Sequence, residues 1–196
     1  MQKKILITGF DPFGGEKINP SWEAVKLLPD EVGEYKLVKL QIPTVFGKAA
    51  RTVLEKAREI GPDAIICVGQ AGGRAGVTPE VIGINLIEAN IADNEGNQPC
   101  GVPIIAGGDT AHFATLPVRE MVANIRSVSI PAGLSFSAGA FVCNEVLYTA
   151  LNEYKATKTR VGFIHVPFLP EQAKENIPSL SLEKIVEALR QAILAL

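Results

Sequence analysis

Short apolar runs of strand length alternate with segments of helical periodicity along this chain. The clearest run, at residues 64–69, is continuously apolar and rich in β-branched side chains, which is typical of a strand covered on both faces. Helices between successive strands allow parallel pairing. The pattern therefore predicts one domain over residues 1–196, a three-layer α/β/α sandwich with a largely parallel, twisted sheet. The expected strands are 3–8, 35–42, 64–69, 81–87 and 160–165, and the expected helices include 20–28, 46–60, 117–127 and 182–196.

Composition narrows the possible functions. The chain has 196 residues, of which 47% are hydrophobic and 20% charged, so it can bury a sizeable core. A net charge of −2 gives no electrostatic basis for binding nucleic acid or an acidic membrane. No apolar run approaches the length of a membrane span. We therefore expect no nucleic-acid or membrane partner.

The three cysteines lie far apart without a C-x-x-C pair, and there are only two histidines. This pattern favours neither a disulfide framework nor a zinc site, so we expect no metal and no cofactor. No small-residue cleavage site follows the first apolar run, which argues against a secretory signal. Free thiols are typical of a reducing compartment, so the predicted location is the cytoplasm.

Ligands of open α/β sheets bind beyond the carboxyl ends of the strands. Four segments are expected at that edge: 9–15, 70–80, 137–143 and 165–167. Each carries residues that are unusual in a plain connection. The functional site is predicted there.

Cys143 falls in the first turn of a helix that follows Gly139. The positive end of the helix dipole and the free N–H groups at this position both favour a thiolate, and the same N–H groups can hold an oxyanion. The alternative is a small buried hydrophobic residue, because free cysteines are often buried. Cys67, inside the run at 64–69, is interpreted as such a core thiol.

A thiol nucleophile needs a base, and the base needs a third group that orients it. His165 ends a predicted strand and Glu80 ends a glycine-rich segment, so both belong to the same edge as Cys143. Taken singly, His165 could be structural, and Glu80 could be a surface residue paired with Arg74. In the long connection 90–115, His112 is a weaker candidate and Cys100 has no assigned role.

Phe10 and Phe13 lie between glycines in the first loop. A phosphate-binding loop would need Lys and Ser or Thr after its second glycine. Here Glu16 follows Gly15, and a carboxylate would repel phosphate. The two rings indicate either a small apolar pocket or a plug at the end of the sheet.

At these residues the chain closely resembles the pyroglutamyl-peptidase I family, also called pyrrolidone carboxyl peptidases. Five motifs carry the resemblance in order along essentially the whole chain, and together they are far more specific than any one alone. They are G-F-D-P-F-G-G-E-x-x-N-P-S at 9–21, G-Q-A-G-G-R with T-P-E at 69–80, D-N-E-G-N-Q-P at 93–99, S-A-G-A-F-V-C-N at 137–144 and G-F-I-H-V-P-F-L-P-E-Q at 162–172.

The resemblance implies a cysteine peptidase, with a single α/β/α domain, that removes an N-terminal pyroglutamyl residue from peptides without a cofactor. It places the catalytic roles and the substrate contacts on eight positions, and it implies a homo-oligomer, a tetramer or a dimer. The catalytic residues would be Cys143, His165 and Glu80, the apolar pocket Phe10, Phe13 and Phe141, and the polar contacts Asn19 and Gln70.

Two positions depart from the family pattern. Asn90 stands where the family has an arginine associated with the oxyanion region, and Phe136 stands where it usually has asparagine. Two other functions are therefore weighed against the peptidase. One is a catalytically weakened family member that binds pyroglutamyl peptides, and the other is a redox sensor that uses Cys143.

Overall fold

The computed structural model describes residues 2–196, so that Met1 of the predicted domain lies outside the described residues. A six-stranded sheet with the order β2-β3-β1-β4-β10-β5 forms its centre. Four strands are mutually parallel: β1 (Lys3–Phe10), β3 (Tyr35–Ile42), β4 (Ala64–Gln70) and β10 (Arg160–Val166). The short strands β2 (Glu31–Val32) and β5 (Thr78–Pro79) pair antiparallel at the two edges.

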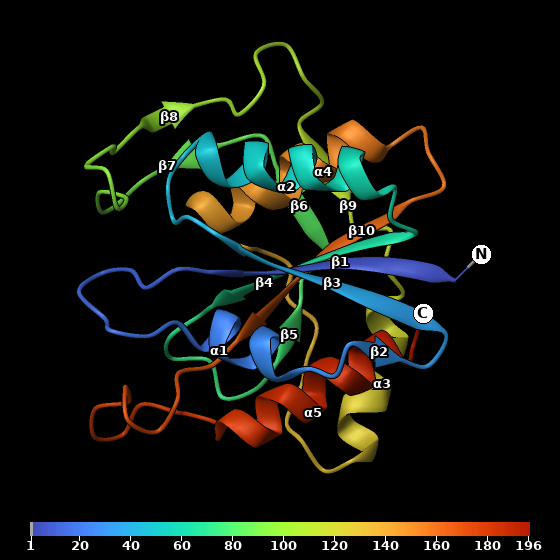
Figure 1. Ribbon diagram of the computed structural model, residues 1–196. Helices are drawn as coiled ribbons and strands as arrows, with labels where there is room; N and C mark the ends of the chain where they lie inside the picture. Colours follow the sequence, from blue (N-terminus) through green and yellow to red (C-terminus); the bar gives the residue numbers. More distant parts are fainter. Residues whose placement is uncertain (1) are drawn as a thin grey trace.

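Helices cover both faces of this sheet (Figure 1). One face carries α1 (Pro20–Leu27), α3 (Val118–Ser127) and α5 (Leu182–Ile193), and the other carries α2 (Lys48–Ile60) and α4 (Val142–Tyr154). The predicted three-layer α/β/α sandwich is confirmed. Its core is correspondingly divided into two apolar clusters, one on each side of the sheet.

The central strands are buried on both faces, as their sequences predict. Every residue of β4 from Ala64 to Gly69 is buried, and all of β10 beyond Arg160 is buried as well. Side chains that alternate along these strands therefore feed both clusters: Ile66 packs in the first and Ile65 in the second. Continuous apolar sequence is what a strand with two covered faces requires.

The predicted strand at 81–87 is wrong. Residues 78–88 form three short pieces, β5, β6 (Ile82–Ile84) and β7 (Ile87–Glu88). The first of these pairs with β10, whereas the long connection at 90–115 supplies the partners of the other two: β8 (Cys100–Val102) pairs with β7, and β9 (Ala111–Phe113) pairs with β6. These two-stranded ribbons extend beside α4, outside the main sheet (Figure 1).

Thr44, which the sequence suggests as the cap of the second helix, has another role. The N-cap of α2 is Gly47. Thr44 instead uses its backbone N–H and its hydroxyl to bind Asp11 Oδ1, each at 2.7 Å. This contact ties the loop after β1 to the loop after β3 at the carboxyl edge of the sheet.

Candidate active site

Gly69 allows the Cys143 thiol to lie directly against β4. A Cβ atom placed on Gly69 would be only 3.0 Å from Cys143 Sγ, so no other residue would leave room for the sulfur there. Gly69 is also the partner of His165 in the register between β4 and β10. Because neighbouring strands are about 4.8 Å apart and paired residues project to the same face of a sheet, this register places the His165 side chain on the face of the carboxyl edge where the thiol lies.

His165 and Glu80 form a buried pair. His165 Nδ1 lies 2.7 Å from Glu80 Oε1, and the two side chains are 5% and 0% exposed. The antiparallel pairing of β5 with β10 brings them together, since the Glu80 N–H donates to the Phe163 carbonyl. With Nδ1 donating to the carboxylate, a neutral imidazole keeps Nε2 as a proton acceptor.

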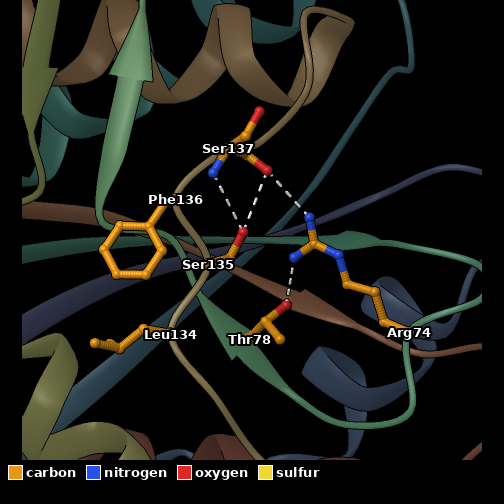
Figure 2. A pocket seen from close by; sticks show the side chains of 6 residues that line it. All are labelled: Arg74, Thr78, Leu134, Ser135, Phe136 and Ser137. Atoms are coloured by element: carbon orange, nitrogen blue, oxygen red, sulfur yellow. Dashed lines mark hydrogen bonds between the residues drawn. The ribbon is translucent and has the colours of Figure 1, made fainter.

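Arg74 is a second partner of the same carboxylate. Its Nη1 donates to Glu80 Oε1 at 2.7 Å and also to the Thr78 hydroxyl, while Nη2 donates to the Ser137 carbonyl at 3.1 Å. Figure 2 shows the guanidinium between Thr78 and Ser137. Arg74 thus connects the loop after β4 to the segment that leads into Cys143. The ion pair that the sequence allowed for is present, but it is partly buried.

The environment keeps Glu80 ionised and His165 neutral. Burial acts to raise the pKa of Glu80, but His165, Ser135 and Arg74 outweigh it, and the pKa lies below its usual value of 4.5. Burial lowers the pKa of His165 below 6.5, although Glu80 acts in the opposite direction. The resting pair is therefore a carboxylate hydrogen-bonded to a neutral imidazole at pH 7.

The helix end favours ionisation of the Cys143 thiol, but it is not the dominant influence on its pKa. Burial and the nearby Glu80 charge raise the pKa of this thiol to about 12, while Arg74 and its own backbone N–H lower it only partly. The thiol is consequently protonated at pH 7 and must lose its proton to a base during a reaction.

A cavity of about 200 Å³ opens beside Cys143. Three aromatic rings predicted for an apolar pocket lie in its wall. Phe141 packs against Phe13 at a centroid distance of 5.3 Å and against Phe46 at 5.0 Å. All residues named from the sequence as substrate contacts line this cavity, together with three others. The lining residues are Phe10, Phe13, Asn19, Thr44, Gln70, Gly72, Phe141 and Cys143.

Asn19 and Gln70 differ in how their amides are used. Asn19 is the N-cap of α1: its Oδ1 accepts from the Ser21 N–H and hydroxyl, and its Nδ2 donates to the Asp11 carbonyl. Gln70 lies at the end of β4, where its Oε1 accepts from Gln172 Nε2 at 3.2 Å. Asn19 therefore shapes the loop that carries the phenylalanines, and Gln70 keeps its own amide donor for the cavity.

Sequence reasoning did not single out Thr44 or Gly72 as wall residues, or Phe46 as a ring that packs against the wall residue Phe141. Thr44 and Phe46 precede a helix and resemble its start, whereas Gly72 is one of several glycines in its loop. Only the contact of Phe46 with Phe141 reveals its role.

Four residues weighed from the sequence lie elsewhere. His112 stacks on Tyr148 and contacts Asn152, both on α4, and Cys100 donates to Glu88 in the β7–β8 ribbon. Asn90 is exposed and does not line the cavity. Phe136 is 67% exposed and lines a different, open hollow with Arg74 (Figure 2).

Within residues 2–196 there is no cluster of three or more His, Cys, Asp or Glu side chains that could hold a metal ion. Over the same described range, the helices are too short or too polar to cross a bilayer.

A thiol beside an imidazole, with the imidazole held by a carboxylate, is the arrangement of hydrolases that use a cysteine nucleophile. Comparisons with known proteins give the particular family. The family model described as pyroglutamyl peptidase matches residues 3–196. The chain therefore belongs to the pyroglutamyl peptidase family, as the five motifs predicted, and it is an enzyme of the pyroglutamyl-peptidase I type. This supports the peptidase prediction and not the binding-module alternative.

Individual relatives agree. A pyrrolidone-carboxylate peptidase of Clostridium perfringens is 49% identical over 199 residues, covering 98% of this chain and 92% of its own. The crystal structure of pyroglutamyl peptidase I from Bacillus amyloliquefaciens superposes with a TM-score of 0.96 at 49% identity, covering 100% of this chain and 95% of that one. A mutant pyrrolidone carboxyl peptidase from Pyrococcus furiosus gives 0.94 at 40% identity, covering 98% and 97%.

Proposed function

We propose that this chain hydrolyses the bond between an N-terminal pyroglutamyl residue and the rest of a peptide, with Cys143 as nucleophile, His165 as base and acid, and Glu80 as the orienting carboxylate. One observation carries this proposal. The Cys143 thiol lies both in the wall of the cavity and against Gly69, the strand partner of His165, which Glu80 holds at 2.7 Å.

The first step forms a thioester. His165 Nε2 accepts the thiol proton as Cys143 Sγ bonds to the pyroglutamyl carbonyl carbon, which gives a tetrahedral intermediate. The intermediate collapses with cleavage of the C–N bond, and the proton passes from His165 to the leaving amine. Glu80 holds Nδ1–H throughout and stabilises the transient imidazolium.

The second step releases pyroglutamate. Water attacks the thioester carbon as His165 takes one of its protons, and the C–S bond breaks with return of that proton to the Cys143 sulfur. The backbone N–H of Cys143 belongs to the first turn of α4, where N–H groups have no partner within the helix. It is the donor we assign to the developing oxyanion.

The cavity suits the chemistry of the pyroglutamyl ring. Pyroglutamate is a compact, neutral lactam without a free amine, so a pocket of aromatic rings with a few amide or hydroxyl groups fits it better than a charged site. Phe10, Phe13 and Phe141 supply the apolar wall, and Gln70 supplies a polar group. Asn19 also lines the wall, as expected, and its side chain caps the N-terminus of α1.

The proposed function also implies particular substrates, partners and a cellular location. The substrates are small peptides that begin with pyroglutamate, and no nucleic-acid or membrane partner is expected from a chain with a net charge of −2. A thiol nucleophile works in a reducing compartment, which favours the cytoplasm. The family resemblance favours a homo-oligomer, a tetramer or a dimer, which light scattering of the purified protein measures directly.

The decisive experiment is amine release from a pyroglutamyl amide by the purified protein under reducing conditions, beside Cys143→Ser and Cys67→Ser. We expect turnover by the parent and by Cys67→Ser. The rate of Cys143→Ser should fall by roughly 10⁴-fold or more, as for other nucleophile deletions. No turnover by the parent would refute the function, and equal turnover by Cys143→Ser would refute the nucleophile.

A further inference from the structure

Gln172 binds four separate groups from its place in the loop after β10. Its Oε1 accepts from the Leu169 N–H at 3.2 Å. Its Nε2 lies within hydrogen-bond distance of the Ile18 carbonyl at 3.4 Å, of Glu16 Oε2 at 3.3 Å and of Gln70 Oε1 at 3.2 Å. No proposed catalytic step uses Gln172, although one of its partners lines the cavity beside Cys143.

Backbone groups fix the direction of the Gln172 amide. The Leu169 N–H can only donate, so it must meet the oxygen of Gln172, and the Ile18 carbonyl can only accept, so it must meet the nitrogen. Flipping the amide would therefore oppose donor to donor and acceptor to acceptor at once. Each such mismatch would leave a partly buried polar group without a hydrogen-bond partner, which is unfavourable.

The direction of the Gln70 amide follows from that of Gln172. Because Gln172 Nε2 is the donor in their contact, the atom that Gln70 turns toward it must be Oε1. Gln70 then has its Nε2 group left over, and within residues 2–196 no protein hydrogen bond engages this nitrogen. The Leu169 N–H thus fixes the direction of the Gln172 amide, and the Gln172 amide fixes Gln70 with its N–H donor available at the cavity.

We infer that Gln172 is a positioning residue that fixes Gln70 as a hydrogen-bond donor toward the lactam carbonyl of the substrate. This inference rests on the proposed function, in which the cavity holds the pyroglutamyl ring. The lactam carbonyl is an acceptor, and a rotated Gln70 would present its own carbonyl oxygen to it. The Leu169–Gln172–Gln70 chain therefore selects a ring that bears a carbonyl over a ring of the same size without one.

The test is a nearly isosteric substitution that reverses the direction of the hydrogen bond between residues 172 and 70. Gln172→Glu keeps the oxygen that Leu169 N–H needs but can no longer donate to Gln70, so the Gln70 amide must turn and present its oxygen to the cavity. A new carboxylate beside Glu16 would also add repulsion, and the variant is therefore made together with Glu16→Gln. Glu16→Gln alone is the matched control.

Binding is measured by calorimetry in the Cys143→Ala background with two ligands, a pyroglutamyl amide and the corresponding cyclopentanecarbonyl amide, which lacks the lactam. We expect Gln172→Glu/Glu16→Gln to lower the preference for the pyroglutamyl ligand by about 10-fold or more, with the affinity for the carbocycle unchanged. In the active enzyme, KM should rise while kcat changes less than about threefold.

Two results would overturn the inference: a preference equal to that of Glu16→Gln, or an equal loss for both ligands, which would indicate a merely structural role. If the Gln172 variant does not fold, Gln70→Glu reverses the same polarity from the cavity side, and an unchanged preference there is equally contradictory. Failure of the proposed function itself looks different, because the parent would then turn over no pyroglutamyl amide at all.

Discussion

Two hollows of the molecule differ in what they offer a ligand: Arg74 lines one of them, and Cys143 lines the other. The hollow around Phe136 has a volume of about 430 Å³, more than twice the 200 Å³ of the cavity beside Cys143. It is open to solvent, and its arginine is already bound to Glu80, Thr78 and Ser137 (Figure 2). The smaller cavity has aromatic walls, a thiol and an amide donor. The larger volume therefore does not mark the reactive site. The smaller cavity is the one that contains reactive groups not already bound to other protein groups.

Arg74 lies in the wall of the larger hollow but acts on residues of the catalytic site. It lines the larger hollow, yet its hydrogen bonds hold the carboxylate of the catalytic pair and the segment that leads to Cys143. Three of the five N–H donors of this guanidinium are already bound to protein groups, which leaves fewer of them for a ligand. Substitutions at the Glu80–His165 pair, in the cavity and at the open hollow test this difference between the two regions.

The largest effect is expected from Glu80→Gln. The amide can donate to His165 Nδ1 and thereby hold the imidazole in the tautomer whose Nε2 carries a proton, which cannot accept one from Cys143. We expect kcat to fall by roughly 10²–10⁴-fold with little change in KM. Steady-state kinetics beside Glu187→Gln, which alters contacts with Arg190 and Gln191 on α5, provides the control. Retention of half the parent's kcat would contradict the assigned role.

The pH dependence tests the protonation states of the pair. Burial lowers the pKa of His165 below 6.5, and a protonated imidazole cannot act as base, so kcat/KM should fall about tenfold per pH unit on an acidic limb centred below pH 6.5. No alkaline loss from the Cys143 thiol is expected below its pKa of about 12. A midpoint above pH 7, measured with a neutral pyroglutamyl amide, would be inconsistent with a buried neutral His165.

The free energy of unfolding should also decrease as the pH falls. Below pH 6.5 the unfolded chain binds a proton at His165 that the folded chain resists, and Glu80, whose pKa is also lowered, adds a similar term below pH 4.5. The stabilising contribution of both groups is thus present at neutral pH and is lost as the pH falls. Urea unfolding from pH 7 to pH 4 measures it, and a parent that gains stability over this range would contradict the pKa directions.

Phe141→Ala tests the cavity wall. The ring contacts both Phe13 and Phe46, so its removal opens the pocket on one side. Because burying a large apolar side chain contributes about 1.5–3 kcal/mol, we expect KM for a pyroglutamyl amide to rise roughly 10-fold. The matched control is Phe113→Ala, since Phe113 is a phenylalanine that is 70% exposed on β9. Equal KM values for the two variants would show that the cavity does not hold the ring.

Phe136→Ala should have the smallest effect. Its ring is 67% exposed and points away from Arg74 (Figure 2). We expect kcat/KM within about twofold of the parent and a free energy of unfolding within about 0.5 kcal/mol, as for other exposed positions. A tenfold loss of kcat/KM in a folded protein would mean that the open hollow takes part in substrate binding, and the division drawn between the two regions would fail.

Much of this protein could be predicted from its sequence, because the signals are local. Apolar runs of strand length identify β1, β4 and β10, and helical periodicity identifies the helices on either side. Five spaced motifs placed the chain in its family, and the position of Cys143, His165 and Glu80 after strands placed them at one edge of the sheet. These inferences depend on periodicity and chain order, which a single sequence contains in full.

Other features were decided only by the tertiary structure. The strand expected at 81–87 breaks into two pieces, β6 and β7, because their partners come from the long connection at 90–115, a pairing across distant residues that no local pattern encodes. Thr44 binds Asp11 rather than capping a helix, and Phe46 reaches Phe141. The thiol pKa of about 12 likewise depends on burial against Gly69 and on the Glu80 charge, whereas the sequence showed only the helix end. Sequence thus determined which groups are available, and packing determined their protonation states and which of them can meet a substrate.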